Sequence, residues 1–529
     1  MISNTFVNVS AMGIVALLKF FLISIVVSRL SLEDYGLYLI FLLFTYRGMA
    51  GFFLFGLPVF VTKLVAENKI AKYVINTSLI ISFIVATIIF ILWLAFGKYI
   101  ESALLTRDMQ ILLVGSLLFQ YPLMIFKAAI EGMQKFKLLR TIEVLSAVIS
   151  FVFTVVWLGF FKDIQVLMYV FFASMLFEFL LLFYYLYFVK KVIDKRKANV
   201  RIFLIKKQLI LHFSFVKIFG FLSNQGDRVI IALFLTPAAL AIYDIVTRIP
   251  YLLKNVFSQI NIALLPLISS KYRTDKNKMS FYYERGLDLL IYITFPIISI
   301  LIMNSGNILS IWISDDMALY GGLMVLYFFW NYINPPYTFG WVFLNATEKK
   351  LDKLTRVSFI TSIVRLFLLT MFIVPFGVYG IAYASIISLG AMMFYVSSLY
   401  ARVFELSLLK LTANVIVKLL MSISISYVIY RILSIFSTNA FFLFFTHSVI
   451  SAFIIWGVLY KFSLLDSNKK IIDKYGKRLP VMARIEKWDA LDDLEAITNA
   501  FDGVMGARGD LGVEIPAAKV PLAQKKVIK

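Results

Sequence analysis

Residues 142–197 decide the fold: IEVLSAVISFVFTVVWLGFF at 142–161, VLMYVFFASMLFEFLLLFYYLYFV at 166–189 and KKVIDKRK at 190–197. Each of the first two segments is long and apolar enough to cross a bilayer as a helix, which takes about 20 residues. The basic run after them is typical of a cytoplasmic loop, because Lys and Arg are retained on that side of a membrane. The stretch therefore predicts two helical spans followed by a cytoplasmic segment.

The same alternation of apolar segments and polar loops runs through most of the 529 residues, of which 61% are hydrophobic. Soluble domains are about 45–50% apolar, and the mean hydropathy of +0.88 agrees with the excess. We predict an all-α polytopic membrane protein with about fourteen transmembrane helices. The predicted spans are 8–29, 37–61, 76–96, 111–131, 142–161, 166–189, 209–234, 238–262, 287–312, 320–345, 357–375, 378–400, 412–435 and 440–461.

Basic side chains collect in alternate loops, which predicts the orientation. The net charge of +22 would suggest nucleic acid as a partner of a soluble protein, but most Lys and Arg residues here lie between apolar segments, as the positive-inside rule requires. With an even number of spans, both termini are expected on the cytoplasmic side of the cytoplasmic membrane, and nucleic acid is not expected as a partner. The richest predicted cytoplasmic loop is 190–208.

That loop follows the sixth predicted span and divides the chain. We predict an N-lobe of six spans with its connecting loop at 1–208, a C-lobe of six spans at 209–405 and two appended helices at 406–465. A faint internal repeat supports the halves: Ser31–Tyr38 follows the first span and Thr236–Tyr243 follows the seventh, with similar residues at matching positions.

Near residue 465 the apolar runs shorten and charge density rises. Residues 481–486 read as a strand, 490–500 as a helix with one apolar face and 503–507 as a second strand. We predict a short α/β fragment within 466–529 and do not expect it to be an independent domain.

Ionisable residues inside predicted spans are costly and are therefore candidates for function. Basic residues predominate among them, and a surplus of cations at membrane depth calls for an anion such as phosphate, which Arg binds bidentately. A polar stripe on each of spans seven and eight predicts a wet cavity between the halves. The candidate cavity cations are Lys19, Lys217, Arg228, Arg248 and Arg365, and the candidate charge partners or coupling groups are Asp227, Asp244 and Glu178.

Structural roles for the same charges stay open. Asp244 and Arg248 are one helical turn apart and can pair, and Asp227 can neutralise Arg228 or Arg248. Two more lysines, Lys127 and Lys254, can extend to the lipid headgroups, or Lys127 can pair with Glu131. Breaks are expected within or beside spans at Gly56–Pro58, Gly306–Asn307 and Asn334–Pro336, either as plain kinks or where backbone lines a cavity.

Several motifs resemble the polysaccharide and lipid-linked oligosaccharide flippases of the multidrug/oligosaccharidyl-lipid/polysaccharide exporter superfamily. The resemblance covers about 1–465 and is carried by Tyr35-Gly36-Leu37-Tyr38, Phe55-Gly56-Leu57-Pro58, Ser223-Asn224-Gln225-Gly226-Asp227-Arg228, Tyr243, Pro266 and Phe376-Gly377-Val378-Tyr379-Gly380-Ile381-Ala382. It implies two six-helix lobes around a central cavity and a substrate of sugars linked to undecaprenyl diphosphate. The anionic diphosphate of such a substrate fits the surplus of cations.

The tail, about 472–529, resembles pyruvate kinase through Arg484-Ile485-Glu486 and Ala507-Arg508-Gly509-Asp510-Leu511-Gly512. The resemblance implies that Glu486 and Asp510 are vestigial metal-binding positions, while Arg484 replaces the catalytic lysine of that family. One βα unit cannot close an eight-stranded barrel. We therefore interpret the tail as the product of a join of two genes, without enzyme activity.

The sequence supports a flippase that moves a polyprenyl-diphosphate-linked oligosaccharide, an O-antigen, capsule or exopolysaccharide unit, across the cytoplasmic membrane by alternating access. Its expected partners are the lipid bilayer and the anionic lipid-linked sugar, with contact to polysaccharide polymerase or export machinery. A drug or cation antiporter of the same fold is the alternative, and a pyruvate kinase acting through the tail is the third. No catalytic residue, cofactor or metal is expected, since the chain has no Cys and two widely separated His residues, His212 and His447.

Overall fold

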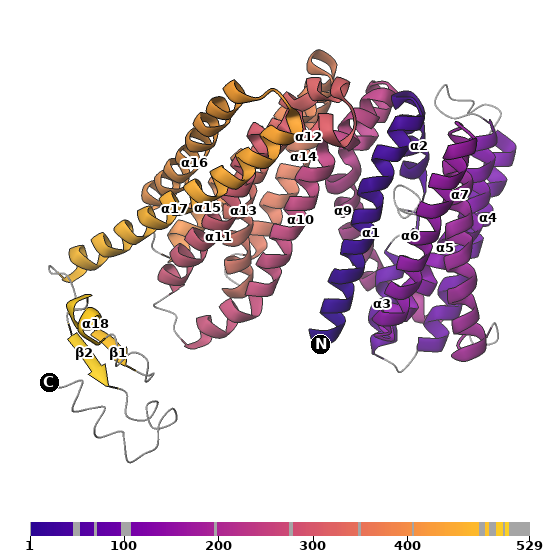
Figure 1. Ribbon diagram of the computed structural model, residues 1–529. Coiled ribbons are helices and arrows are strands. Elements are labelled where there is room, and N and C mark those ends of the chain that lie inside the picture. The colour runs from indigo at the N-terminus through magenta and orange to yellow at the C-terminus, as the bar shows by residue number, and fades with distance from the viewer. Residues whose placement is uncertain are drawn as a thin grey trace. The chain divides into compact units, whose positions relative to one another are not determined.

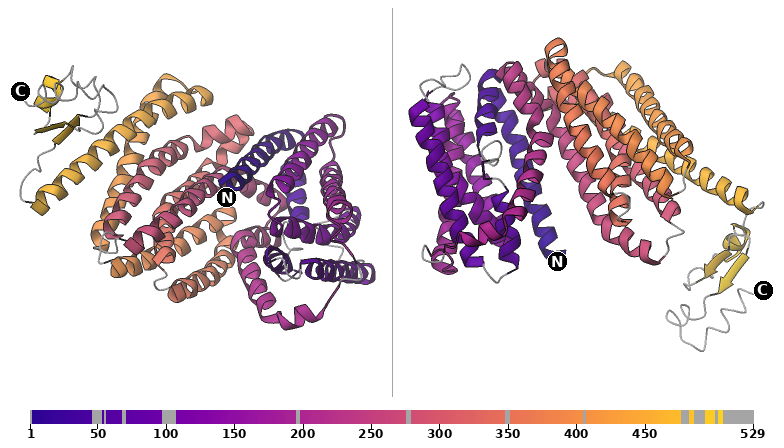
Figure 2. Two further views of the ribbon diagram at one scale, coloured as in Figure 1. Left: turned by 90° about the horizontal axis from the view of Figure 1, so that it is seen from below. Right: turned by 180° about the vertical axis from the view of Figure 1, so that it is seen from behind.

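The computed structural model describes residues 2–45, 53–54, 56–67, 71–96, 107–194, 198–274, 279–347, 351–404, 407–475, 482–485, 494–500 and 503–506. The chain forms two compact units, Met1–Phe453 and Ile454–Lys529, which are described separately. The helices of the first unit run broadly alongside one another (Figure 1 and Figure 2).

Helices account for the first unit within the described residues. In order they are α1 (Ile2–Arg29), α2 (Leu32–Phe44), α3 (Leu57–Ala66), α4 (Ala71–Phe96), α5 (Arg107–Gly132), α6 (Phe136–Phe160), α7 (Gln165–Tyr184) with a π-helical end (Tyr185–Val189), α8 (Arg201–Ile205), α9 (Lys207–Phe234), α10 (Pro237–Thr274), α11 (Met279–Met303), α12 (Ser305–Trp312), a 3-10 turn (Asp315–Tyr320), α13 (Gly321–Thr347), α14 (Leu351–Phe376), α15 (Val378–Phe404), α16 (Leu408–Phe436) and α17 (Ala440–Tyr475), which crosses into the second unit.

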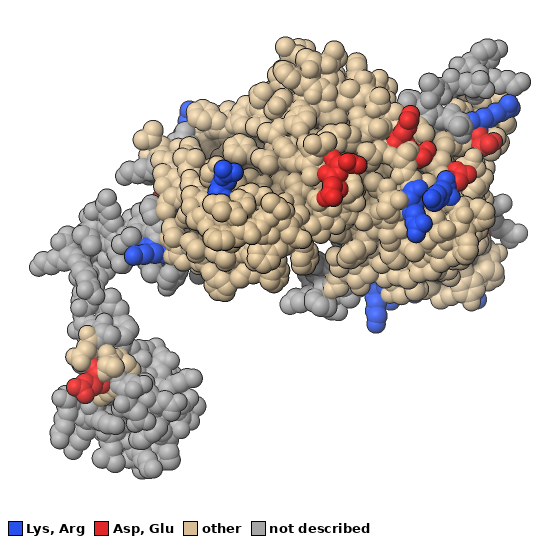
Figure 3. Space-filling view, turned by 45° about the horizontal axis from the view of Figure 1, so that its top comes forward, with Lys and Arg blue, Asp and Glu red and all other residues tan. Residues whose placement is uncertain are grey.

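The predicted all-α membrane fold is confirmed, and most predicted spans coincide with one helix each. Among the described residues, nine helices are long and apolar enough to cross a membrane. The count of fourteen spans stays a prediction. Exposed apolar side chains such as Leu92 on α4, Phe153 on α6 and Phe367 on α14 fit contact with lipid, and uncharged residues cover most of the described surface seen in Figure 3.

Two predicted spans are not single helices, and one predicted break is absent. The segment 37–61 contains the end of α2 and the start of α3, where Gly56 adopts a positive φ of 70° ahead of Leu57 and Pro58. The segment 287–312 is divided at Asn304, between α11 and α12, close to the expected break at Gly306–Asn307. At Asn334–Pro336 the backbone of α13 continues as a helix, so the expected break there is wrong.

Packing between helices joins α2 to the second half of the chain. The largest apolar core includes Tyr35, Leu39 and Ile40 of α2 together with residues of α10, α11 and α13. A second core is built mainly by α3, α4, α5 and α7. The division into lobes at 1–208 and 209–405 stays a prediction, and α2 is one of the elements that connect the two parts, because its core residues pack with those of α10.

The second unit contains two short parallel strands and one helix among its described residues. Strand β1 (Met482–Ile485) pairs with β2 (Gly503–Gly506), and α18 (Leu494–Ala500) lies between them in sequence. This order matches the strand, helix and strand read from the sequence. The backbone of Arg484 lies in β1, whereas Glu486 and Asp510 lie outside the described residues.

Candidate functional site

A cavity of about 700 Å³ lies among the helices of the first unit. Side chains of α1, α2, α5, α6 and α7 line it from the first half of the chain, and Gln225, Arg228, Arg248 and Leu252 line it from α9 and α10. Most of the wall is apolar, as ligand sites generally are. The predicted cavity at spans seven and eight therefore has a counterpart in the structure.

The charges at this cavity lean positive. Among the described lining residues, the basic side chains are Lys19, Lys127, Arg140, Arg228 and Arg248, and the acidic ones are Glu143 and Glu178. Of the predicted cavity cations, Lys19, Arg228 and Arg248 are thus at the wall. The side chain of Lys217 lies outside the described residues, and Arg365 is not among the lining residues.

One carboxylate holds both cavity arginines of the second half. Arg228 Nη2 donates to Asp244 Oδ1 at 2.8 Å, and Arg248 Nη2 donates to Asp244 Oδ2 at 2.6 Å. The hydroxyl of Tyr35 on α2 donates to Oδ2 as well, at 2.9 Å. Asp244 is 1% exposed, so its charge is balanced inside the protein. The expected pairing of Asp244 with Arg248 one turn later is present.

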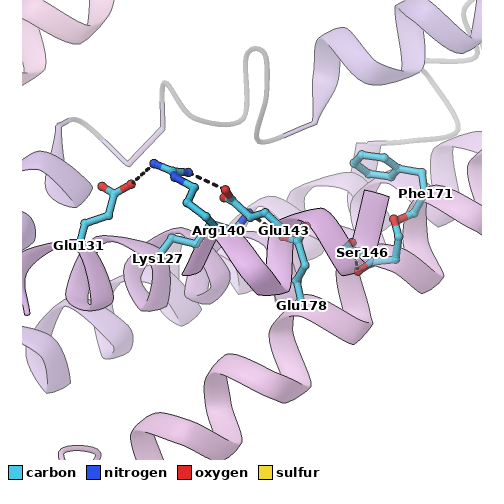
Figure 4. A network of polar contacts seen from close by, with 8 residues as sticks. Lys127, Glu131, Arg140, Glu143, Ser146, Phe171 and Glu178 are labelled. Atoms are coloured by element: carbon cyan, nitrogen blue, oxygen red, sulfur yellow. Dashed lines mark hydrogen bonds and ion pairs between the residues drawn. The ribbon is translucent and has the colours of Figure 1, made fainter. Parts of the chain in front are cut away.

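A second charged cluster connects α5, α6 and α7 (Figure 4). Lys127 Nζ lies 3.1 Å from Glu143 Oε1 and 2.5 Å from Glu178 Oε2. Arg140 Nη1 is 2.5 Å from Glu143 Oε2, and Arg140 Nη2 is 3.4 Å from Glu131 Oε1. Glu178 therefore has the basic partner Lys127, and four members of this cluster line the cavity: Lys127, Arg140, Glu143 and Glu178.

The remaining candidates form a buried pair in the second half. Arg365 Nη2 on α14 lies 2.6 Å from each oxygen of Asp227 on α9, and the hydroxyl of Tyr243 donates to Asp227 Oδ2 at 2.7 Å. The interpretation that Asp227 neutralises Arg228 or Arg248 is therefore wrong, because Arg365 lies against it. Arg365 also donates to Ser385 on α15.

These contacts reduce the surplus of cations expected at membrane depth, because each of these arginines has an acidic partner. Arg228 and Arg248 share one carboxylate and Arg365 has its own. Lys254 lies 4.7 Å from the ring centroid of Trp330, a cation–π contact. The sequence reading missed Tyr35 as a partner of Asp244, although Tyr35 stands in a motif already singled out after the first span.

Comparisons with known proteins agree with this architecture. The solved structure of lipid II flippase MurJ in an inward closed conformation superimposes with a TM-score of 0.57, covering 85% of this chain and 99% of that one at 16% identity. An inward-facing multidrug resistance MATE family transporter of the MOP superfamily gives a TM-score of 0.51, covering 74% of this chain and 96% of that one at 15% identity. The chain thus has the polytopic helical fold that these two solved structures share.

A comparison of the sequence with protein families assigns the membrane unit. The model of the polysaccharide biosynthesis protein family matches residues 25–317, more than half of the chain. The chain belongs to this family.

The tail matches a different protein. The pyruvate kinase barrel domain model matches residues 449–529. Pyruvate kinase of Mycobacterium tuberculosis is 57% identical over 60 residues, which are 11% of this chain and 13% of that relative. The chain thus spans about an eighth of the length of the curated relative, and the resemblance of the tail to a pyruvate kinase fragment is confirmed.

Proposed function

We propose that the protein is a flippase for a polyprenyl-diphosphate-linked oligosaccharide, which it moves from the cytoplasmic to the outer leaflet by alternating access. The family concerns polysaccharide biosynthesis, and the fold is shared with membrane transporters. The chain is a multi-pass membrane protein whose fold is shared with these solved structures. The substrate, the cytoplasmic membrane and the cytoplasmic placement of both termini belong to the proposal.

The observation that carries the proposal is the presence of Lys19, Arg228 and Arg248 in the lining of one cavity. A volume of about 700 Å³ suits a diphosphate and the first sugars attached to it. Two guanidinium groups on neighbouring helices can each give parallel N–H bonds to phosphate oxygens. The apolar remainder of the wall suits the isoprenoid part of such a lipid.

A drug or cation antiporter is the rival function. Coupling to a cation would need a carboxylate that can exchange its partner for that cation. The three acidic candidates already have fixed basic partners: Asp227 has Arg365, Asp244 has two arginines and Glu178 has Lys127. Displacing a buried guanidinium leaves a charge unpaired and costs about 3–5 kcal/mol. The same cost applies to an anion that takes the arginines from Asp244, so the order of effects among acidic and basic variants distinguishes the two functions.

We also propose that the tail performs no phosphoryl transfer, because Arg484 stands where the resemblance to pyruvate kinase places the catalytic lysine, and a guanidinium cannot replace an ammonium in that role. Contact of the membrane unit with polysaccharide polymerase or export machinery stays a prediction.

The proposal is tested by translocation of a fluorescent polyprenyl-diphosphate-linked glycan in proteoliposomes. Arg228→Gln with Arg248→Gln should abolish translocation while the protein still inserts. The matched control is Arg285→Gln on α11, since Arg285 is exposed and is not a lining residue. Wild-type rates for the double variant would contradict the proposal.

A further inference from the structure

Asp244 is the point where three helices meet through polar contacts. Its two oxygens accept from Arg228 on α9, Arg248 on α10 and Tyr35 on α2. The carboxylate itself is 1% exposed and is not a lining residue, whereas its three partners all line the cavity. An anion that enters the cavity therefore meets the guanidinium groups that Asp244 holds.

Both arginines have donor capacity left over. A guanidinium carries five N–H donors. Arg228 directs Nη1 to Gln225 and Nη2 to Asp244, and Arg248 directs Nη2 to Asp244. The Nε of each arginine is buried without a hydrogen-bond partner. These Nε atoms have no surface open to the cavity, so a ligand there is bound by the terminal Nη groups, and several acceptor oxygens can engage more of them than a single carboxylate does.

The contact of Tyr35 with Asp244 lies where α2 and α10 touch through their backbones. Gly36 packs against Pro237 so closely that any side chain at position 36 would overlap the Pro237 backbone. Only glycine permits this approach. Tyr35 precedes this close approach by one residue, and its hydroxyl joins α2 to Asp244 of α10, which also binds the cavity arginines.

We propose that Asp244 holds N–H donors of Arg228 and Arg248 that the substrate diphosphate takes over, and that both guanidinium groups turn from Asp244 to the diphosphate when it binds in the cavity. This inference rests on the proposed function and adds to it a selection for diphosphate. A diphosphate carries more charge and more acceptor oxygens than a carboxylate, so it can bind the guanidinium groups of both arginines at once. A monophosphate has fewer oxygens to share between two arginines, and a neutral lipid has no means to compete.

Displacement has a consequence for the helices. Once the arginines turn to the ligand, Asp244 keeps only the Tyr35 hydroxyl among its three partners. A buried carboxylate without a counter-charge is unfavourable. The favourable response is for Asp244 to reach water or another donor, which loosens the contact of α2 with α10. Substrate binding and helix separation are thereby linked, because each favours the other.

The test uses cysteines introduced at Glu33 and Thr236, which are exposed and flank the contact of Gly36 with Pro237. The chain has no Cys of its own, so spin labels at these two sites report the separation of α2 and α10. Farnesyl diphosphate, farnesyl monophosphate and farnesol are titrated in lipid nanodiscs, and binding is measured in parallel by calorimetry. We expect the diphosphate to lengthen the label separation, the monophosphate to require at least about tenfold more ligand, or about 1.4 kcal/mol, and farnesol to have no effect.

Asp244→Asn removes the competing charge and should bind the diphosphate about tenfold more tightly, with the labels already separated without ligand. Tyr35→Phe is the second variant if Asp244→Asn does not fold. It leaves every charge in place and should lower the diphosphate concentration that separates the labels. Asp288→Asn, whose carboxylate binds Lys418 away from the cavity-lining residues, is the control and should change neither readout.

The outcomes separate the two claims. If the diphosphate binds wild type but the labels do not move and Asp244→Asn binds no more tightly, displacement is wrong and the cationic cavity stands. If neither wild type nor Asp244→Asn binds the diphosphate, both claims fail. Equal effects of diphosphate and monophosphate overturn the selection for diphosphate.

Discussion

Two aspartate–arginine groups in the same half of the chain have different surroundings. At Asp244, the arginines line the cavity and the carboxylate lies behind them. At Asp227, Arg365 binds the carboxylate together with Tyr243, and neither charge is a cavity-lining residue. The same residue types therefore line a cavity in one place and link helices in the other, and exposure to the cavity decides what else a guanidinium can contact.

Among the variants considered, Arg365→Gln should have the largest effect, and this effect should be a loss of protein stability. It leaves Asp227 buried with one tyrosine hydroxyl, which costs about 3–5 kcal/mol for an uncompensated buried charge. Thermal unfolding in detergent measures the loss. Adding Asp227→Asn should recover part of it. An unchanged unfolding temperature together with lost translocation would instead make Arg365 a substrate contact like Arg248.

Arg248→Gln should act on binding. A charge-assisted bond contributes about 1.5–3 kcal/mol, so affinity for a polyprenyl diphosphate should fall roughly ten- to hundredfold. Arg248→Lys should keep only part of the wild-type affinity, since an ammonium does not form the two parallel hydrogen bonds of a guanidinium. Calorimetry on both variants checks this ranking. Full recovery with Lys would show that charge alone, without the planar fork, recognises the ligand.

Glu178→Gln should have a smaller effect. Lys127 keeps Glu143 as a partner, so the free energy of unfolding should fall by only about 1 kcal/mol, the contribution of an ordinary hydrogen bond. The translocation rate should fall by less than tenfold. If the protein were an antiporter, the order would be reversed: neutralising Glu178, Asp227 or Asp244 would lower the translocation rate more than neutralising any arginine. Translocation rates of all these variants in one proteoliposome series distinguish the two.

Truncation after residue 465 should have the smallest effect. The charged clusters described above all lie before this position, so insertion and translocation are expected to be unchanged, and the full chain should show no pyruvate kinase activity. A truncated protein that inserts normally but does not translocate would give the tail a role in transport.

The sequence by itself determined the membrane class, the approximate bounds of most helices and the foreign character of the tail. These features are local: about 20 consecutive apolar residues define a span without reference to the rest of the chain, and the tail keeps a contiguous motif. The sequence also named the charged residues at membrane depth, and one local pair, Asp244 with Arg248 a turn later, was predictable from helix geometry.

Only the tertiary structure decided which charges act together. Tyr35 and Asp244 are 209 positions apart, and Asp227 and Arg365 are 138 apart, so no periodicity within one helix relates them. Their pairing depends on how each helix is rotated about its axis when it packs against its neighbours. Because that rotation also decides which guanidinium faces the cavity, the division between arginines that line the cavity and those that do not follows from packing.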